Sequence, residues 1–91
     1  MSTQAIVDPE ALEQFARELK QFNAQLAQSS SRLRGALKKA GETWRDQEYQ
    51  KFSREFDQTM RVLNQFTQSA ERQVPFLLRK AQRARDYLRQ R

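Results

Sequence analysis

Carboxylates are the side chains in this sequence best suited to acid–base chemistry, and several of them stand close together in pairs. Examples are Glu10 with Glu13 and Glu55 with Asp57. A catalytic pair needs one carboxyl group whose pKa is raised by burial or by its neighbour. Nothing in the pattern raises the pKa of either pair or removes water from it. We interpret them as parts of a solvated helix face.

Two residue types on which enzymes and metal sites often rely are missing. The 91 residues include no cysteine and no histidine, which removes thiol nucleophiles, imidazole bases and zinc sites of the Cys/His kind. The chain has two glycines, Gly35 and Gly41, too few for a glycine-rich phosphate loop. We therefore predict that the protein is not an enzyme and that it uses no cofactor, metal ion or small-molecule substrate.

Basic residues gather at the carboxyl end, where they could contact phosphates or carboxylates. The net charge is +6, and residues 76–91 contribute +5 of it, from six cations minus the one acid, Asp86. The cations of this basic tail are Arg79, Lys80, Arg83, Arg85, Arg89 and Arg91. Three interpretations stay open: a solvated helix end that complements the helix dipole, contact with an acidic partner surface, and binding of nucleic acid or anionic lipid through phosphates.

These side chains belong to a chain with two long apolar stripes at helical spacing, because apolar residues recur three and four positions apart. The first stripe is Leu12, Phe15, Leu19, Phe22, Leu26, Leu33, Leu37 and Ala40. The second is Tyr49, Phe52, Phe56, Met60, Leu63, Phe66, Ala70 and Val74. We expect each stripe to lie on one helix and the two stripes to pack face to face, with the phenylalanines in the core.

Local signals indicate where the helices begin and end. Asp8 followed by Pro9 predicts a helix start, with an N-cap acceptor and a proline at the first helical position. Gly41 is expected to end this helix in the left-handed conformation. Asp46 is a candidate N-cap for the next helix. We expect the first helix to run through residues 29–31, where three serines lower helix propensity, because the apolar stripe stays in phase across them. A break there is the alternative.

Pro75 interrupts the second helix, because a proline inside a helix removes a hydrogen bond and crowds the preceding turn. The apolar pattern nevertheless continues in phase at Leu77, Ala81, Ala84 and Leu88. A kinked continuous helix and two helices meeting near this proline both fit the pattern. Since little of the first helix is left to cover residues 76–91, we expect this segment to project or to fray.

Together these features predict an all-α protein with a single domain, residues 1–91. We expect a two-helix antiparallel hairpin: helix 1 at about 9–40, a bend at 41–46, helix 2 at about 47–74, and a basic helical extension at 76–91. Turn residues are too few for a β-sandwich or barrel. No apolar run is long enough to span a membrane, and no cleavable signal peptide is visible.

The second helix carries more apolar surface than one neighbouring helix can cover. The surplus residues are Met60, Val62, Val74, Phe76 and Leu78. Because a thin two-helix core provides little stability, we predict that two hairpins pair into a four-helix bundle. A monomeric hairpin with scattered exposed apolar residues is the alternative.

The bend carries the only tryptophan, in the sequence Trp44-Arg45-Asp46. With the Asp-Pro-Glu helix start, the absence of cysteine and an aromatic-rich second helix, this layout resembles the WXG family, the small helical-hairpin proteins linked to type VII secretion. Asp46 stands in place of the glycine of the family's Trp-x-Gly motif. Tyr87 is followed four positions later by Arg91, where the family's Tyr-x-x-x-Asp/Glu export signal has an acid.

The resemblance implies a homodimer, or a heterodimer with a similar hairpin, acting without catalysis as a secretion-system substrate, a carrier or a structural partner. It also implies that Trp44 and Asp46 lie at a surface that meets the partner. A hydrophobic plug that closes the bend is the other interpretation of Trp44. The alternative function is a basic-tailed binder of nucleic acid or of an anionic membrane surface. We expect a cytoplasmic protein, and export without a cleavable signal peptide stays open.

Overall fold

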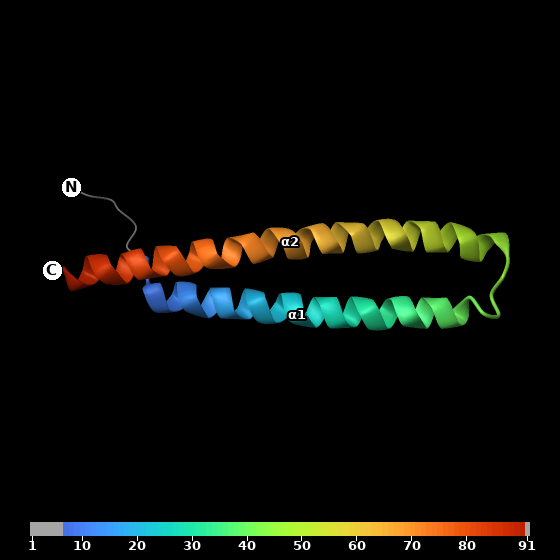
Figure 1. Ribbon diagram of the computed structural model, residues 1–91, viewed down its shortest axis with the longest axis horizontal. Helices are drawn as coiled ribbons and strands as arrows, with labels where there is room; N and C mark the ends of the chain where they lie inside the picture. Colours follow the sequence, from blue (N-terminus) through green and yellow to red (C-terminus); the bar gives the residue numbers. More distant parts are fainter. Residues whose placement is uncertain (1–6, 91) are drawn as a thin grey trace.

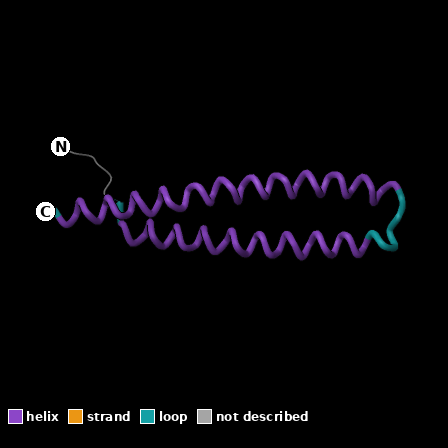
Figure 2. The backbone as a smooth tube through the Cα atoms, in the orientation of Figure 1, coloured by secondary structure: helices purple, strands orange, loops and turns teal. Residues whose placement is uncertain are grey.

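Two antiparallel helices joined by a short bend make up the computed structural model, which describes residues 7–90 (Figure 1). Helix α1 spans Pro9–Ala40 and helix α2 spans Gln47–Arg89. The molecule is a rod with extents of 68 × 22 × 14 Å. Helix fills both arms, and the loop residues lie at the bend and at the ends of the described chain (Figure 2). The predicted all-α helical hairpin is confirmed.

An aspartate caps the start of each helix. Asp8 accepts a hydrogen bond of 3.0 Å from the Glu10 N–H, and Pro9 follows at the first helical position. Asp46 accepts one of 3.1 Å from the Tyr49 N–H. Each carboxylate satisfies a backbone donor that has no partner within its helix, which stabilises a helix start by about 1 kcal/mol.

Neither predicted weak point breaks its helix. α1 is continuous across residues 29–31, so a break there is wrong. α2 runs through Pro75 as one helix (Figure 1), which selects the continuous form of the two alternatives. Because Pro75 and Glu71 are both exposed, water can reach the Glu71 carbonyl, which the proline leaves without its usual donor.

Gly41 ends α1 without the left-handed conformation expected for it. Its φ is −68°, and its N–H donates to the Leu37 carbonyl at 3.0 Å, so the chain leaves the helix in a right-handed turn. The glycine meets a different need, because a Cβ at this position would overlap the phenol of Tyr49. The Tyr49 hydroxyl lies 3.5 Å from the same Leu37 carbonyl, and this close approach ties the start of α2 to the end of α1.

Replacing each glycine with alanine should change stability in opposite directions. Nothing lies within 4 Å of a Cβ added at Gly35, and alanine favours helix, so Gly35→Ala should raise the free energy of unfolding by about 0.5–1 kcal/mol. Gly41→Ala should lower it by about 1–3 kcal/mol, because Tyr49 must move. Urea unfolding followed by circular dichroism measures both, and a stabilised Gly41→Ala variant would contradict the contact with Tyr49.

Small side chains make the contact between the two helices. The buried apolar residues are Ala16, Met60, Ala70 and Ala81, and no large side chain within residues 7–90 is completely shielded from water. Small residues let helices approach closely, which leaves bulky neighbours at the edges of the contact. The expected phenylalanine core is therefore wrong for four rings that are 44–55% exposed, namely Phe15, Phe22, Phe52 and Phe66.

Candidate partner interface

The apolar stripe of α1 is two columns wide, and α2 covers only one of them. The covered column is half-buried and consists of Leu12, Leu19 and Leu26. The other column is 50–55% exposed and consists of Phe15, Phe22 and Leu33. Residues spaced three and four apart spread over a broad arc of a helix, and a single neighbouring helix reaches only the nearer part of that arc. The aromatic column is left without a partner in the isolated hairpin.

Apolar side chains of α2 continue this exposed column on the same side of the hairpin. The rings of Phe22 and Phe66 meet edge to face, with centroids 5.9 Å apart. Val62, one turn before Phe66, is 53% exposed. We call Phe15, Phe22, Leu33, Val62 and Phe66 the aromatic face. Exposed apolar side chains gathered on one side of a molecule typically mark an interaction site.

The residues predicted as surplus apolar surface on α2 fall into different environments. Val62, Phe76 and Leu78 are exposed, while Val74 is half-buried. Met60 is only 4% exposed, so its assignment to a partner surface is wrong. Met60 precedes Leu63 by three residues and therefore shares the side of α2 that faces α1.

Trp44 packs at the bend against the first turns of α2. Its ring centroid lies 5.2 Å from that of Tyr49 and 6.0 Å from that of Phe52. Its backbone N–H donates to the Ala40 carbonyl at 3.0 Å. The half-buried indole thus covers the end of the contact between the helices, as a hydrophobic plug would, and keeps part of its surface open to solvent.

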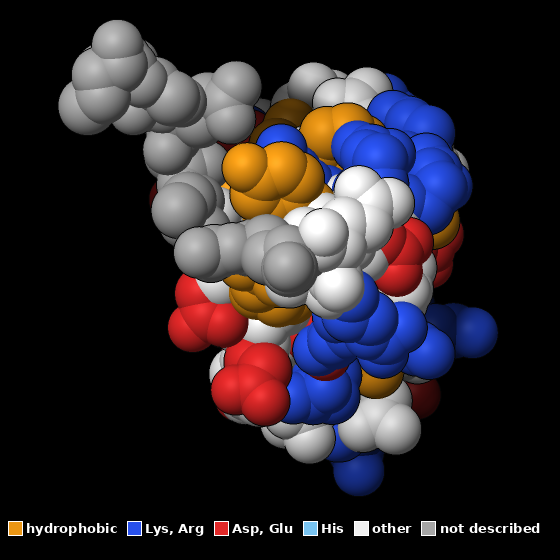
Figure 3. Space-filling view, turned by 90° about the vertical axis from the view of Figure 1, so that its left-hand side faces the viewer, with side chains coloured by type: hydrophobic (Ala, Val, Ile, Leu, Met, Phe, Trp, Pro, Cys, Tyr) orange, Lys and Arg blue, Asp and Glu red, His pale blue; other side chains and the backbone are white. Residues whose placement is uncertain are grey.

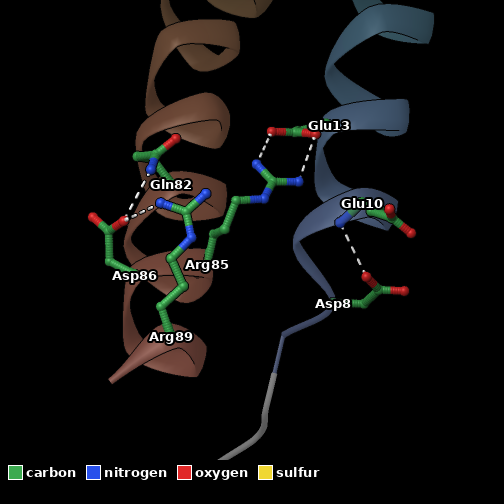
Figure 4. Close-up of polar contacts among 7 residues, drawn as sticks. All are labelled: Asp8, Glu10, Glu13, Gln82, Arg85, Asp86 and Arg89. Atoms are coloured by element: carbon green, nitrogen blue, oxygen red, sulfur yellow. Dashed lines mark hydrogen bonds and ion pairs between the residues drawn. The ribbon is translucent and has the colours of Figure 1, made fainter. Parts of the chain in front are cut away.

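The basic tail packs on α1 as far as Arg85, so the expectation that residues 76–91 project or fray is wrong for this part of the tail. Arg85 reaches the start of α1 and donates hydrogen bonds of 2.5 and 3.0 Å to the Glu13 carboxylate (Figure 4). Ala81, one turn earlier, is 0% exposed. Side chains lean toward the amino end of their own helix, so Glu13 and Arg85 on antiparallel helices lean toward each other. Only the last turns of α2 extend past the start of α1 (Figure 1).

The ion pair shifts both pKa values toward the charged forms. The hydrogen bond from Arg85 lowers the pKa of Glu13, with desolvation opposing it. The same hydrogen bond raises the pKa of the Arg85 guanidinium. The charged pair is therefore the stable form at neutral pH.

The free energy of unfolding should depend on pH through Glu13. A carboxylate whose pKa is lower in the folded state adds stability above its unfolded pKa of about 4.3, and that stability is lost as the pH falls through the folded pKa. Between about pH 6 and pH 2, the Tm of the unmodified protein should therefore fall more than that of Glu13→Gln. Parallel melting curves for the two proteins would contradict a stabilising ion pair.

The other tail cations within residues 7–90 lie at the surface. Arg89 approaches Asp86 at 4.0 Å, and Asp86 also accepts a hydrogen bond of 3.0 Å from Gln82 (Figure 4). Three further tail cations are exposed and form no ion pair within residues 7–90: Arg79, Lys80 and Arg83. Arg91 lies outside the described residues. At the open end of the hairpin, basic side chains gather on one side (Figure 3).

A buried polar residue lies in the contact between the helices, where none was predicted. Asn23 is 6% exposed, its Nδ2 donates to the Thr67 carbonyl of α2 at 3.3 Å, and its Oδ1 has no hydrogen-bond partner. Asn23 follows Ala16 by seven residues and precedes Ser30 by seven, so the column that faces α2 was visible in the sequence. A single buried asparagine can fix the register between helices.

The carboxylates do not assemble a reactive site in the described part of the chain. Glu13 is bound to Arg85, and Glu10, Glu55 and Asp57 are exposed. Residues 7–90 contain no cluster of three or more Asp or Glu side chains placed to hold a metal ion. Neither described helix combines the length and the apolar character needed to cross a membrane.

Comparison with known proteins matches the chain to a family model. The family model WXG100, described as proteins of 100 residues with WXG, matches residues 4–87. This range includes nearly all of both helices and the bend with Trp44. No match is found among curated proteins or among solved structures.

Proposed function

The chain belongs to the WXG100 family, and from this premise we propose that it is a protein–protein interaction module that pairs with a second hairpin and serves type VII secretion. Proteins of this family are in general small, non-enzymatic helical proteins that are secreted without a signal peptide. They commonly form dimers with similar hairpins. For this chain we propose the role of a secreted substrate or of a carrier for one.

The aromatic face is the observation that carries the proposal. An isolated hairpin leaves the rings of Phe15, Phe22 and Phe66 about half exposed. A core this thin contributes only about 3–5 kcal/mol. A second hairpin placed against this face would complete a four-helix bundle and bury the rings. Two identical faces can meet across a two-fold axis, because such an interface uses the same patch on both chains.

Light scattering coupled to size exclusion tests the proposal. One chain has a mass of 10.8 kDa, so a homodimer should appear at about 21–22 kDa. If the protein is poorly helical by itself and becomes helical when a similar hairpin is added, the result indicates a heterodimer. A stably folded monomer at all concentrations would overturn the proposal.

Asp46 has a structural role that accounts for the departure from the family's Trp-x-Gly motif. Its side chain caps α2 by accepting from the Tyr49 N–H, so a helix-starting residue stands where the family has a flexible glycine. Trp44 keeps its place at the end of the rod, and we propose that its exposed part contacts the partner hairpin. Export through the pattern that begins at Tyr87 would have to tolerate a basic residue at its last position.

Binding of nucleic acid or anionic membrane by the basic tail as a unit has less support. Arg85 is bound to Glu13, and Arg89 lies beside Asp86. These contacts reduce the charge that the tail presents to a phosphate surface. The cations of α2 that remain free follow a different pattern, which runs along most of the helix.

A further inference from the structure

Five arginines of α2 form a row along the side of the helix that faces away from α1. They are Arg54, Arg61, Arg72, Arg79 and Arg83, and all are exposed. At about 100° per residue they fall within about 40° of one another around the helix axis. The buried residues Ala70 and Ala81 lie on the opposite side. The cations of α1 between residues 17 and 39 spread over about 160° and form no such row.

The five guanidinium groups of this arginine row have no charged partner within residues 7–90. Within residues 7–90, none of the five takes part in an ion pair, and none forms a side-chain hydrogen bond. Within an arc of about 80° centred on the row there is one acid, Asp86, and it is engaged by Gln82 and Arg89. The arc also holds Phe76 and six glutamines: Gln47, Gln50, Gln58, Gln65, Gln68 and Gln90. The outer face of α2 is therefore made almost wholly of guanidinium and amide groups.

This composition fits a phosphate backbone better than it fits a bilayer or a protein. Guanidinium groups bind phosphate oxygens through two parallel hydrogen bonds, and glutamine amides also donate to phosphates. A helix that lies on a membrane inserts an apolar face, and the apolar side of α2 is turned to α1 and to the aromatic face. A protein–protein interface has an apolar core, which this row lacks.

The length of the row also fits a nucleic-acid duplex. From the first to the last arginine it extends about 43 Å along a straight helix. One turn of B-form DNA is about 34–36 Å. A rod laid along the duplex can therefore meet phosphates on both strands, since each strand crosses its path within one turn.

We propose that the outer face of α2 binds the phosphate backbone of double-stranded DNA without reading its sequence. The row points away from α1, and its centre lies about 80° from Val62 and about 120° from Phe66 around the axis of α2. It stays accessible whether or not two hairpins pair through the aromatic face. Loss of the dimer and loss of DNA binding are thus separate outcomes.

Fluorescence anisotropy with a labelled duplex of about 30 base pairs tests the proposal. If all five arginines meet phosphates, log K should fall against log salt with a slope of about −4.5, which is roughly 500-fold between 50 and 200 mM. Changing the five arginines to glutamine should abolish binding at 50 mM salt. The matched control removes the same charge from α1 (Lys20, Arg32, Arg34, Lys38 and Lys39, all to glutamine) and should keep the wild-type slope. Equal losses in both variants would overturn the proposal.

A second variant tests the geometry of the row at constant charge and composition. It combines Arg72→Gln with Gln73→Arg and Arg83→Gln with Gln82→Arg, which moves two cations about 100° around the helix. The salt slope should fall to about −2.7, because two phosphate contacts are lost. An unchanged slope would show that net charge alone acts and would overturn the proposal.

Vesicles of phosphatidylcholine with phosphatidylserine serve as the competing phosphate surface. The DNA proposal is overturned if the protein binds vesicles but not the duplex, and if the variant without the five arginines loses its vesicle binding. That result would assign the row to a membrane surface. The absence of duplex binding at about 50 mM salt would overturn it as well. Circular dichroism of each variant checks that the helices persist, as expected for substitutions at exposed positions.

Discussion

Phe22→Glu is expected to convert a dimer of about 21–22 kDa into a monomer while both helices persist. Phe22 is 50% exposed and touches Phe66 at the middle of the aromatic face. In a four-helix bundle this position would be buried between the hairpins, and a carboxylate placed there would have no cation to pair with. Losing a central aromatic contact costs about 2–4 kcal/mol, so the dimer Kd should rise about 30- to 1000-fold.

Gln21→Glu is the matched control for this substitution. It adds the same charge one residue away, on the exposed side of α1, where a carboxylate stays in water. A dilution series followed by light scattering should leave this variant dimeric at concentrations at which Phe22→Glu is monomeric. The proposal fails if both variants dissociate alike, or if Phe22→Glu stays dimeric with an unchanged Kd.

The aromatic face also shows what the sequence could predict about this fold. Spacing and caps predicted two helices, because a helix start depends on local residues such as Asp8 and Asp46. Which column of a stripe faces the neighbouring helix depends on how closely the helices approach. That distance is set by Ala16, Ala70 and Ala81, small residues that carry little weight in a hydrophobic pattern. The phenylalanines were therefore assigned to a core that the small residues occupy.

Contacts between residues far apart in the chain were the other feature that the sequence could not predict. Glu13 and Arg85 are 72 positions apart, so their pairing follows from the register of the two helices and from no local motif. The need for a glycine at position 41 likewise depends on Tyr49 across the bend. The arginine row is not apparent from the charge of successive segments of the chain. It appears when the residues are placed around the axis of α2, where the five arginines lie on one side of the helix.

Ala70→Leu is expected to lower the free energy of unfolding of the isolated hairpin more than Phe22→Ala does. Ala70 is 1% exposed and lies where the helices touch, so three added carbon atoms must push α2 away from α1. Overpacking of this kind costs about 1–3 kcal/mol, a large share of the about 3–5 kcal/mol that a small core provides. Phe22→Ala removes a ring that is half in water and should cost less in the isolated hairpin.

Urea unfolding at one fixed protein concentration measures these variants, because any pairing of hairpins would make stability depend on concentration. Ala36→Leu adds the same atoms at an exposed position of α1 and should change the free energy of unfolding by no more than about 0.5 kcal/mol. If Ala70→Leu is too unstable to measure, Ala70→Val adds less volume and should fall between the two. If Ala70→Leu and Ala36→Leu are equally stable, the buried alanines do not set the distance between the helices. Close approach of the helices would then no longer explain why the aromatic face is exposed.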